Sequence, residues 1–378
     1  MAAQPRNPGR GVERVTLITP TRHRPARVAM TLQYYADQRL PSPIHIDDAS
    51  DDDRTERVVQ RYRASLNLVY RRRPESGHMR AYGDLLETVT TPYVLMAGDD
   101  DFFPPDTMAR CVSFLDERPS AAVAMGTVIH IQGTERADGS MALSREEPLL
   151  HDMRTIGDPS PAKRLWEFSW PTIYFNTHTI KRTTALRDSF HPCVKRFLSH
   201  ADEWTAMPFL EVAFNALALI QGTQHVLPGL FHVWLHGPRP VHPGYVRYDR
   251  MERLATMRWA EHLPAFTDIV GTALREATGL SATECRERAE AAWLGYLIPW
   301  LATAQRSITR RCKLVGGVPR WRRALVAIGQ EGPRALVSRL KHRRQHGMIS
   351  WRSLRHPSSP YHAAFNQIER ALARSPAA

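Results

Sequence analysis

The stretch T-P-Y-V-L-M-A-G-D-D-D-F-F-P-P, residues 91–105, joins an apolar run to three consecutive aspartates. Residues 93–96 form the apolar run, and its short length and bulky side chains indicate a buried β-strand. The periodicity of residues 106–117 then indicates a helix. We therefore expect a strand that ends at an acidic loop and is followed directly by a helix.

The same alternation of strand and helix leads back from this stretch towards the N-terminus. The predicted strands span 15–19, 44–46 and 66–70, and the helices predicted after them span 28–40, 55–64 and 79–88. Strands that alternate with helices of about ten residues indicate a mostly parallel sheet with helices on both faces. The sequence therefore predicts an α/β fold.

The pattern changes beyond the acidic loop. A strand is predicted over 121–131, a polar loop over 132–161 and a helix over 204–220. From residue 248 onward the periodicity is helical almost throughout, and helices are predicted over 251–263, 266–278, 282–304 and 334–342. We therefore expect a mainly helical C-terminal region after the sheet.

Composition excludes several classes of protein. Of the 378 residues, 43% are hydrophobic and 24% are charged, which is typical of a globular protein and not of a fibre or a disordered chain. No uncharged apolar run reaches the roughly 18 residues of a membrane span, and the N-terminus lacks the apolar core of a signal peptide. The four cysteines are far apart and form no C-x-x-C pair, which argues against a zinc ribbon or a disulfide framework and favours a reducing cytoplasm.

The net charge of +13 comes from one late segment. Residues 306–355 contain fourteen lysines and arginines and a single acid, Glu331, whereas the rest of the chain has 37 residues of each sign. Tryptophans interleaved with these cations are typical of a helix that binds an anionic membrane surface. A segment that binds nucleic acid has the same pattern. A helix whose charged face is solvated, and which covers the domain or forms a homo-oligomer, has it as well. The sequence leaves these three interpretations open.

Charged and polar residues follow three of the predicted strands. In an open parallel sheet, ligands bind at the carboxyl ends of the strands, and these ends carry residues 19–24, 47–48 and 99–101. Clustered carboxylates repel each other and raise each other's pKa values unless a cation neutralises them. Mg²⁺ or Mn²⁺ with a bound diphosphate meets this need, because these ions prefer a few carboxylates and complete their coordination with phosphate oxygens and water.

Structural explanations compete with this ligand-binding interpretation. One aspartate is enough to cap the helix that begins near Pro105, so the three aspartates at 99–101 favour a ligand. A polar turn alone explains Asp47 and Asp48. The aspartates at 51–53 are assigned mostly to solvent and to the N-terminus of the next helix, where negative charge is favourable.

Three motifs together resemble a known family. The motifs V-T-L-I-T-P-T-R-H-R-P at 15–25, H-I-D-D-A-S-D-D at 45–52 and the stretch at 91–105 follow one another in a characteristic order and spacing. They resemble the nucleotide-sugar domain of GT-A-fold glycosyltransferases, and in particular the large family 2. The resemblance covers residues 14–126 well and about 170–240 loosely. It implies a GT-A fold, a mostly parallel mixed sheet flanked by helices, and a nucleoside-diphosphate sugar as donor.

The resemblance also assigns roles to residues at the strand ends. In the family the D-x-D motif, here Asp99 and Asp101, binds the metal and the diphosphate of the donor. The donor-binding residues that the resemblance implies are Thr19, Pro20, Thr21, Arg24, Asp47, Asp48, Gly77, Arg80, Asp99 and Asp100. The loop at 75–83 departs from the family pattern at Glu75, Ser76 and Gly83.

The expected reaction needs a base, whatever the family. When an acceptor hydroxyl displaces a nucleoside diphosphate from the anomeric carbon, a proton leaves the nucleophile, and a nearby carboxylate can accept it. Family members have a Glu-Asp pair followed by an aromatic residue, and S-H-A-D-E-W at 199–204 contains the two acids in reverse order. Asp202 and Glu203 are therefore both candidate bases, and one base opposite the leaving group gives inversion. The alternative is that both are first-turn acids of the following helix.

Two later motifs supply further candidates. His232, Trp234 and His236 alternate along a predicted strand, so both histidines share a face. In related enzymes a histidine of this region completes the metal shell or contacts the diphosphate, and His236 fits that place, with a structural role as the alternative. The motif W-P-T-I-Y-F-N-T-H suits either an acceptor wall or a core, through Trp170, Tyr174, Asn176 and His178.

The sequence thus predicts a metal-dependent glycosyltransferase that uses a nucleoside-diphosphate sugar, with UDP as the expected nucleotide, and inverts the anomeric centre. Its predicted parts are a flexible tail at 1–13, a nucleotide-sugar half at 14–130, an acceptor half at 131–247 and a basic helical region at 248–378. The acceptor is left open between a small molecule, a lipid-linked sugar and a protein. The location is expected to be the cytoplasm, with the inner membrane surface as the alternative.

Two other functions are alternatives. A nucleotidyltransferase also needs clustered acids and a metal, but the sequence lacks a glycine-rich basic loop near its N-terminus. A protein that binds nucleic acid or a membrane surface through a degenerate GT-A domain is the other alternative, and the intact aspartate triplet argues against it.

Overall fold

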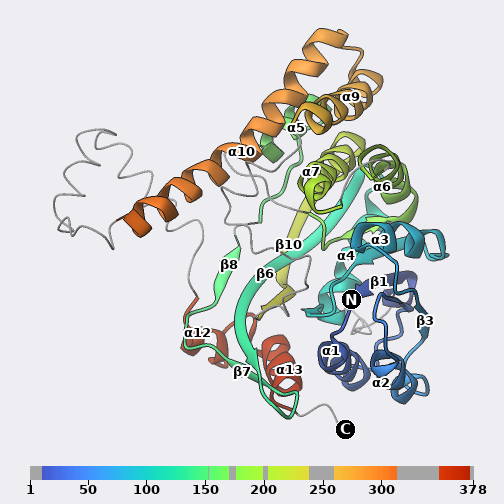
Figure 1. The fold of residues 1–378 in the computed structure, drawn as a ribbon, viewed down its shortest axis with the longest axis vertical. Coiled ribbons are helices and arrows are strands. Elements are labelled where there is room, and N and C mark those ends of the chain that lie inside the picture. Colours follow the sequence, from blue (N-terminus) through green and yellow to red (C-terminus); the bar gives the residue numbers. More distant parts are fainter. Residues whose placement is uncertain are drawn as a thin grey trace, which may run out of the picture.

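The structure is a computed structural model that describes residues 11–151, 153–169, 176–198, 203–237, 259–312 and 349–374. Its centre is a ten-stranded mixed sheet in which eight strands follow the order β3-β2-β1-β4-β9-β6-β10-β5, while β7 and β8 pair with β6 (Figure 1). The sheet separates two hydrophobic cores, and neighbouring residues of one strand, such as Leu95 and Met96, belong to different cores. The predicted α/β fold with helices on both faces is thereby confirmed.

The N-terminal half contains the parallel strands that carry the acidic loop. Its elements are β1 (Val15–Thr21), α1 (Pro25–Asp37), β2 (Ile44–Asp48), α2 (Arg54–Tyr62), β3 (Leu68–Arg72), α3 (His78–Glu87), β4 (Tyr93–Met96) and α4 (Pro105–Glu117). β1 pairs in parallel with β2 and β4, so Thr21 lies beside Asp48 and Ile18 lies beside Met96. The carboxyl ends of these strands therefore meet at one edge of the sheet, and the predicted elements of this half are confirmed within a few residues.

A short 3-10 helix, η1 (Val12–Arg14), precedes β1. Residues 1–10 of the predicted tail lie outside the described residues, and Val12 is buried in the core.

The second half adds long and antiparallel strands. β6 (Ala121–Glu135) and β10 (Thr223–His236) pair in parallel, and β9 (Ile180–Arg182) runs antiparallel to β4 and β6. β5 (Asp101–Phe102) is antiparallel to β10. The strands β7 (Met141–Leu143) and β8 (Leu149–His151) are antiparallel to β6.

The prediction of a loop over 132–161 is wrong for part of that range. β6 continues to Glu135, and β7 and β8 lie within the same stretch. The end of β6 alternates between buried and exposed residues, so it contains no continuous apolar run. These strands were not apparent in the sequence because β7 and β8 are short and form by pairing with β6.

A layer of helices covers one face of the second half. It contains α5 (Pro161–Ser169), α6 (Thr183–Phe197), α7 (Glu203–Gln221), α9 (Trp259–Thr278) and α10 (Ala282–Cys312). Phe209 of α7 stacks on Trp293 of α10 with ring centroids 4.0 Å apart. The helices predicted over 204–220 and 282–304 are therefore confirmed.

The two helices predicted over 251–263 and 266–278 form one helix where the structure describes them. α9 begins at Trp259 and continues through Pro264, although an internal proline removes a backbone hydrogen bond. The next residue, Ala265, is buried in the helical core, so tertiary packing outweighs the local cost of the proline. Residues 251–258 and the helix predicted over 334–342 lie outside the described residues.

The last two helices return to the N-terminal half. Figure 1 shows α12 (Trp351–Arg355) and α13 (His362–Ala373), in red, near β7, and α13 packs against both α1 and β7. Nη1 of Arg374 donates to Oδ2 of Asp37 at 2.5 Å. Most of the basic segment at 306–355, from residue 313 to 348, lies outside the described residues. In the described part of the chain, no helix is long and apolar enough to cross a membrane.

Candidate active site

The acidic loop lies where β1 and β4 end side by side. The N–H of Ala97 donates to the carbonyl oxygen of Ile18 at 2.9 Å and continues the parallel pairing up to the loop. Asp99 and Asp101 are only 3% and 2% exposed, whereas Asp100 is half-buried. The structure therefore buries two of the three predicted aspartates at the edge where the strands end.

The last residue of β1 and a residue of the loop after it bind the first two aspartates. Oγ1 of Thr21 donates to Oδ2 of Asp99 at 2.6 Å, and Nη1 of Arg24 donates to Oδ1 of the same carboxylate. Nη2 of Arg24 donates to Oδ2 of Asp100 at 2.5 Å. The guanidinium thus bridges two carboxylates, an arrangement that suits its planar fork of donors.

These contacts offset the burial of Asp99 only in part. Burial raises the pKa of the Asp99 carboxyl to about 6, against the opposing effect of Arg24. Burial would lower the pKa of Arg24, but Asp99 and Asp100 raise that pKa above its ordinary value. Burial thus disfavours the charged form of Asp99 more than Arg24 favours it, and a bound cation would stabilise that charged form.

Asp101 has a separate set of partners. Nε2 of His232 donates to its Oδ1 at 2.8 Å, and the N–H of Gly98 donates to its Oδ2 at 2.6 Å. Nδ1 of His178 lies 3.3 Å from Oδ2 of Asp101. Burial would raise the pKa of Asp101, but the two histidines bring it below its usual range. The two ends of the D-x-D motif therefore differ, because Asp99 is held from the β1 side and Asp101 is held by histidines.

His236, the predicted metal ligand on β10, contacts aromatic rings. Its ring centroid lies 5.4 Å from that of His130 and 5.8 Å from that of Trp234. On the same strand, His232 is the histidine that binds Asp101. The assignment of His236 to a metal stays a prediction, and His232 is a neighbour of the acidic loop that the sequence analysis assigned no role.

The predicted acceptor wall is described only in part. Trp170 and Tyr174 lie outside the described residues. Asn176 is fully buried, and its Nδ2 donates to Oε1 of Gln224 at 3.1 Å, so it belongs to the interior. His178 lies beside the acidic loop instead of a separate wall, since its Nδ1 also contacts the carbonyl oxygen of Met96 at 2.9 Å.

Asp47 and Asp48, at the end of β2, are buried and bound from β3 and the residue that follows it. Nε of Arg71 donates to Oδ2 of Asp47 at 2.7 Å, and Nε of Arg73 donates to the same oxygen at 2.9 Å. The hydroxyl of Tyr70 donates to Oδ2 of Asp48 at 2.8 Å. Oδ1 of Asp47 is buried and has no hydrogen-bond partner in the described part of the chain.

The sequence analysis missed Arg71 and Arg73. β2 pairs with β3 and β1, which places Arg71 on one side of Asp47 and Pro20 on the other, and Thr19 is buried on β1 next to Pro20. The available signal was the run of arginines at 71–73, directly after a predicted strand. In-register parallel pairing brings this run beside the carboxylates of β2.

The loop before α3 contacts the start of α7. The N–H of Met79 donates to Oε1 of Glu203, and Gly77 lies against the same carboxylate. Nη2 of Arg80 donates to the carbonyl oxygen of Leu198. The structure thus brings together three of the predicted residues from two distant parts of the sequence, whereas Asp202 lies outside the described residues.

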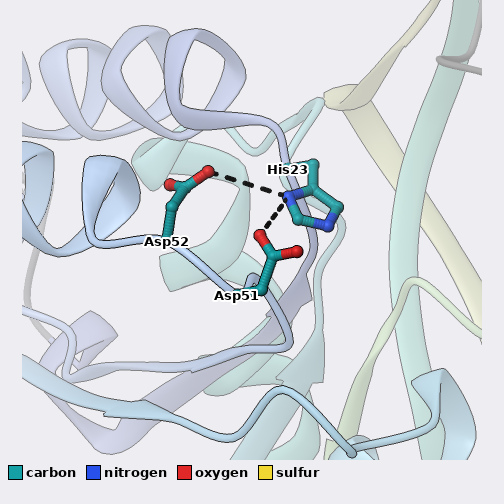
Figure 2. Close-up of side chains that lie close together, drawn as sticks. All are labelled: His23, Asp51 and Asp52. Atoms are coloured by element: carbon teal, nitrogen blue, oxygen red, sulfur yellow. Dashed lines mark ion pairs between the residues drawn. The ribbon is translucent and has the colours of Figure 1, made fainter.

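Figure 2 shows a group of side chains that a metal ion could join, formed by His23, Asp51 and Asp52. Nδ1 of His23 lies 3.6 Å from Oδ1 of Asp51 and 4.0 Å from Oδ2 of Asp52. The side chain of Asp51 is 80% exposed, and Oδ2 of Asp52 lies 2.7 Å from Nη2 of Arg54. Arg54 already neutralises Asp52, so the group needs no metal and agrees with the assignment of residues 51–53 to solvent and a helix terminus.

The part of the chain that contains the acidic loop matches a known family. Residues 16–178 match the family described as glycosyl transferase family 2. The match begins in β1, includes the strand ends that form the acidic site, and ends at His178, beside Asp101. Residues 16–178 form a family 2-like glycosyltransferase domain. The resemblance and the enzyme class predicted from the sequence are therefore confirmed.

Several solved structures are similar to this glycosyltransferase at low sequence identity. The crystal structure of S. aureus TarS 1-349 is 16% identical, covers 95% of this chain and 89% of that chain, and has a TM-score of 0.44. The same protein in complex with UDP-GlcNAc is 15% identical over 78% and 91% of the two chains, with a TM-score of 0.41. The mannosyltransferase PcManGT from Pyrobaculum calidifontis, in complex with GDP-Man and Mn²⁺, is 17% identical over 80% of each chain, with a TM-score of 0.40. No curated protein matches the sequence.

Proposed function

We propose that this glycosyltransferase moves a sugar from a nucleoside-diphosphate sugar, with UDP as the expected nucleotide, to a hydroxyl acceptor in a metal-dependent reaction. The observation that carries the proposal is the loop at 99–101, where three consecutive carboxylates follow β4 next to the end of β1 and Arg24 bridges two of them. A divalent cation and a diphosphate suit such a loop, because the cation binds carboxylates and the phosphates bind the arginine.

The residues at this loop fit a magnesium or manganese ion. Carboxylate oxygens are the preferred ligands of both ions, and burial raises the pKa of Asp99 against the opposing effect of Arg24, so a bound cation would stabilise the charged form of this carboxylate. Asp99 and Asp101 would hold the ion, and His236 remains the histidine predicted from the family. When bound, the ion stabilises the negative charge of the departing diphosphate.

The residues at the end of β2 favour the binding of the nucleoside next to this loop. Oδ1 of Asp47 is a buried acceptor with no partner among the described residues, and such an atom favours a ligand that brings an N–H or O–H group. Pro20 lies beside Asp47 in the sheet, and Thr21 binds Asp99. We therefore assign the base or ribose to the β2 end and the diphosphate to the β4 end.

The acceptor half supplies the base in this proposal. A carboxylate of the pair Asp202 and Glu203 accepts the proton of the acceptor hydroxyl, and a single base opposite the leaving group produces inversion. The acceptor stays open between a small molecule, a lipid-linked sugar and a protein. The anionic membrane surface, the homo-oligomer and the cytoplasmic location remain predictions, because residues 313–348 lie outside the described residues. The family match argues against a nucleotidyltransferase and a nucleic-acid-binding protein.

A screen of nucleotide sugars tests the proposal. The 378-residue chain is incubated with UDP-, GDP- and dTDP-sugars, each with Mn²⁺, Mg²⁺ or a chelator, and thermal unfolding and release of the nucleoside diphosphate are measured. We expect a UDP-sugar to raise the unfolding midpoint and to be hydrolysed slowly, with water as the acceptor, in the presence of a metal only. Stabilisation that is equal in chelator would contradict the metal-dependent reaction.

Asp101→Asn and Asp53→Asn provide the matched pair of variants. Asp101 is buried beside its two histidines, whereas Asp53 is an exposed residue that pairs with Arg57 on the surface. We expect Asp101→Asn to lose metal-dependent hydrolysis and Asp53→Asn to keep it. Equal activity in both variants would show that Asp101 is not needed for the metal-dependent reaction.

A further inference from the structure

We propose that Glu203 is a positioning residue, whose carboxylate caps α3 and holds the donor loop (residues 73–78) against the start of α7. Oε1 of Glu203 accepts the N–H of Met79, the second residue of α3. The first N–H groups of a helix have no partner within the helix, and negative charge is favourable at that end. The contact joins residues 124 positions apart in the sequence and so connects the acceptor half to the donor half.

Gly77 provides the space for this carboxylate. A Cβ atom at residue 77 would lie 2.0 Å from Oε2 of Glu203 and 3.1 Å from its Cδ, which is too close for either atom to remain in place. Gly77 has φ −76° and ψ 154°, an extended backbone conformation that other residues also adopt. A side chain at residue 77 would therefore displace the Glu203 carboxylate, whereas the backbone conformation itself does not require glycine.

Two further contacts fix the donor loop at its ends. Nη2 of Arg80, in the first turn of α3, donates to the carbonyl oxygen of Leu198, which follows α6. On the other side, Nη2 of Arg73 donates to Oγ of Ser76 at 3.2 Å, while its Nε binds Oδ2 of Asp47 at 2.9 Å. The donor loop thus extends from the carboxylate at the end of β2 to the first turn of α7.

This arrangement makes Glu203 unsuitable as the base of the proposed function, on which the catalytic part of the inference rests. A base needs an oxygen within hydrogen-bond reach of the acceptor hydroxyl. Oε1 of Glu203 already accepts a backbone N–H, and Oε2 occupies the space above Gly77. Asp202, which lies outside the described residues, is then the remaining candidate base of the pair.

A double-mutant cycle tests the cap without any substrate. Gly77→Ala should lower the midpoint of thermal unfolding by about 3 °C or more, because the added methyl group displaces the carboxylate. Glu203→Ala removes the same interaction, so the double variant should be no less stable than Glu203→Ala alone. Gly83→Ala is the control on α3, since its Cβ would meet only Phe190, at 3.7 Å, and should not lower the midpoint. Additive losses in the double variant would overturn the proposal.

Glu203→Gln separates positioning from proton transfer. Its amide oxygen still accepts the Met79 N–H, so hydrolysis of a UDP-sugar should stay within about threefold of the parent, and the pH profile should keep its acidic limb. Glu203→Ala should raise KM for the UDP-sugar more than it lowers kcat, because the donor loop loses its anchor. A kcat loss of about 10²–10⁴ for Glu203→Gln, together with loss of the acidic limb, would show that Glu203 is the base. A parent without activity contradicts the proposed function, whereas the stability cycle still decides whether Glu203 caps α3.

Discussion

The part of the protein from β1 to α4, where we propose that the donor binds, and the part from β6 to β10, where we propose that the acceptor binds, differ in the groups that their cationic side chains contact. We refer to these parts as the donor half and the acceptor half. In the donor half, arginines pair with carboxylates at the ends of strands. Arg24 bridges Asp99 and Asp100, and Arg73 binds Asp47. Each of these contacts joins two side chains of opposite charge at the edge of the sheet where we place the donor.

In the acceptor half, buried cations donate to backbone carbonyl groups. Nε and Nη2 of Arg164 donate to the carbonyl oxygens of Leu219 and Ile220, in the last turn of α7, at 2.6 and 2.8 Å. Nζ of Lys181 donates to the carbonyl oxygen of Thr177 at 3.2 Å. A cation at the C-terminal end of a helix satisfies carbonyl groups that have no partner within the helix.

This difference indicates which charged groups are available to bind a metal ion or a phosphate. A carboxylate can exchange an arginine for a metal ion, and an arginine can exchange a carboxylate for a phosphate, because both are ion-binding groups. The carbonyl groups at the end of α7 belong to the scaffold and have no such alternative. We therefore expect substitutions in the donor half to change binding and turnover, and substitutions of these acceptor-half cations to change stability.

Asp99→Asn should cause the largest change and should affect function alone. Turnover of a UDP-sugar should fall by about 10²–10³-fold, since the variant loses a charged ligand for the metal. The free energy of unfolding should change by less than about 1 kcal/mol, because asparagine keeps the shape and no longer repels Asp100. Asp116→Asn is the control, because Asp116 binds Tyr93 at the opposite end of β4. Nucleotide release measures turnover, and urea unfolding measures stability. Full turnover in Asp99→Asn would show that this carboxylate of the donor half is not needed for the reaction.

Arg164→Met should cause the reverse pattern. The side chain is buried, and four carbonyl oxygens, including those of Asp158 and Pro159, lose their donor. Urea unfolding should show a loss of about 2–4 kcal/mol, while the affinity for UDP in the folded protein stays unchanged. Arg57→Met is the control, since Arg57 forms an exposed pair whose loss costs less than about 1 kcal/mol. Weaker UDP binding without loss of stability would argue against a scaffold role for Arg164.

Arg24→Gln should increase the stabilisation of the protein by Mn²⁺. Without the guanidinium, Asp99 and Asp100 repel each other more strongly, so the variant should unfold at a lower temperature than the parent. Mn²⁺ binds the folded state through these carboxylates and should therefore raise the unfolding midpoint more in Arg24→Gln than in the parent. Thermal unfolding with increasing MnCl₂ measures the difference. Equal shifts in the two proteins would mean that Arg24 and the metal do not share these carboxylates.

Lys181 should give a dependence of stability on pH. Burial lowers the pKa of the Lys181 ammonium to about 7, so between about pH 7 and 10.5 the unfolded chain binds more protons than the folded protein. Stability then rises with pH in this window, with a slope of at most about 1.4 kcal/mol per pH unit from this group. Urea unfolding of the parent and of Lys181→Met at pH 7, 8 and 9 isolates the contribution as a difference. A difference that is constant with pH would show that the lysine stays charged.

The donor half could be predicted from the sequence because its signals are local. Each strand is a short apolar run, and the candidate site residues come shortly after it, as Asp99 does after β4. The parallel order of the strands then brings these residues to one edge. The pairing of Asp47 with Arg71 needs the register between β2 and β3, which the separate motifs do not contain.

The acceptor half was less predictable because its contacts are long-range. His232 is 131 residues from Asp101 in the sequence, and only the fold brings the two together, whereas the family resemblance favoured His236. β7 and β8 have weak apolar patterns and depend on pairing with β6. The contact between Gly77 and Glu203 likewise joins two motifs whose relative position only the fold determines.

Calorimetric titration with UDP tests whether the carboxylates at the end of β4 bind the donor through a metal. The parent and Asp99→Asn are each titrated in Mn²⁺ and in chelator. We predict that the parent binds UDP at least about tenfold more tightly with Mn²⁺, a difference of about 1.4 kcal/mol, and that Asp99→Asn shows the same weak affinity in both conditions. Metal-independent binding to the parent, or full metal dependence in Asp99→Asn, would contradict this mode of binding.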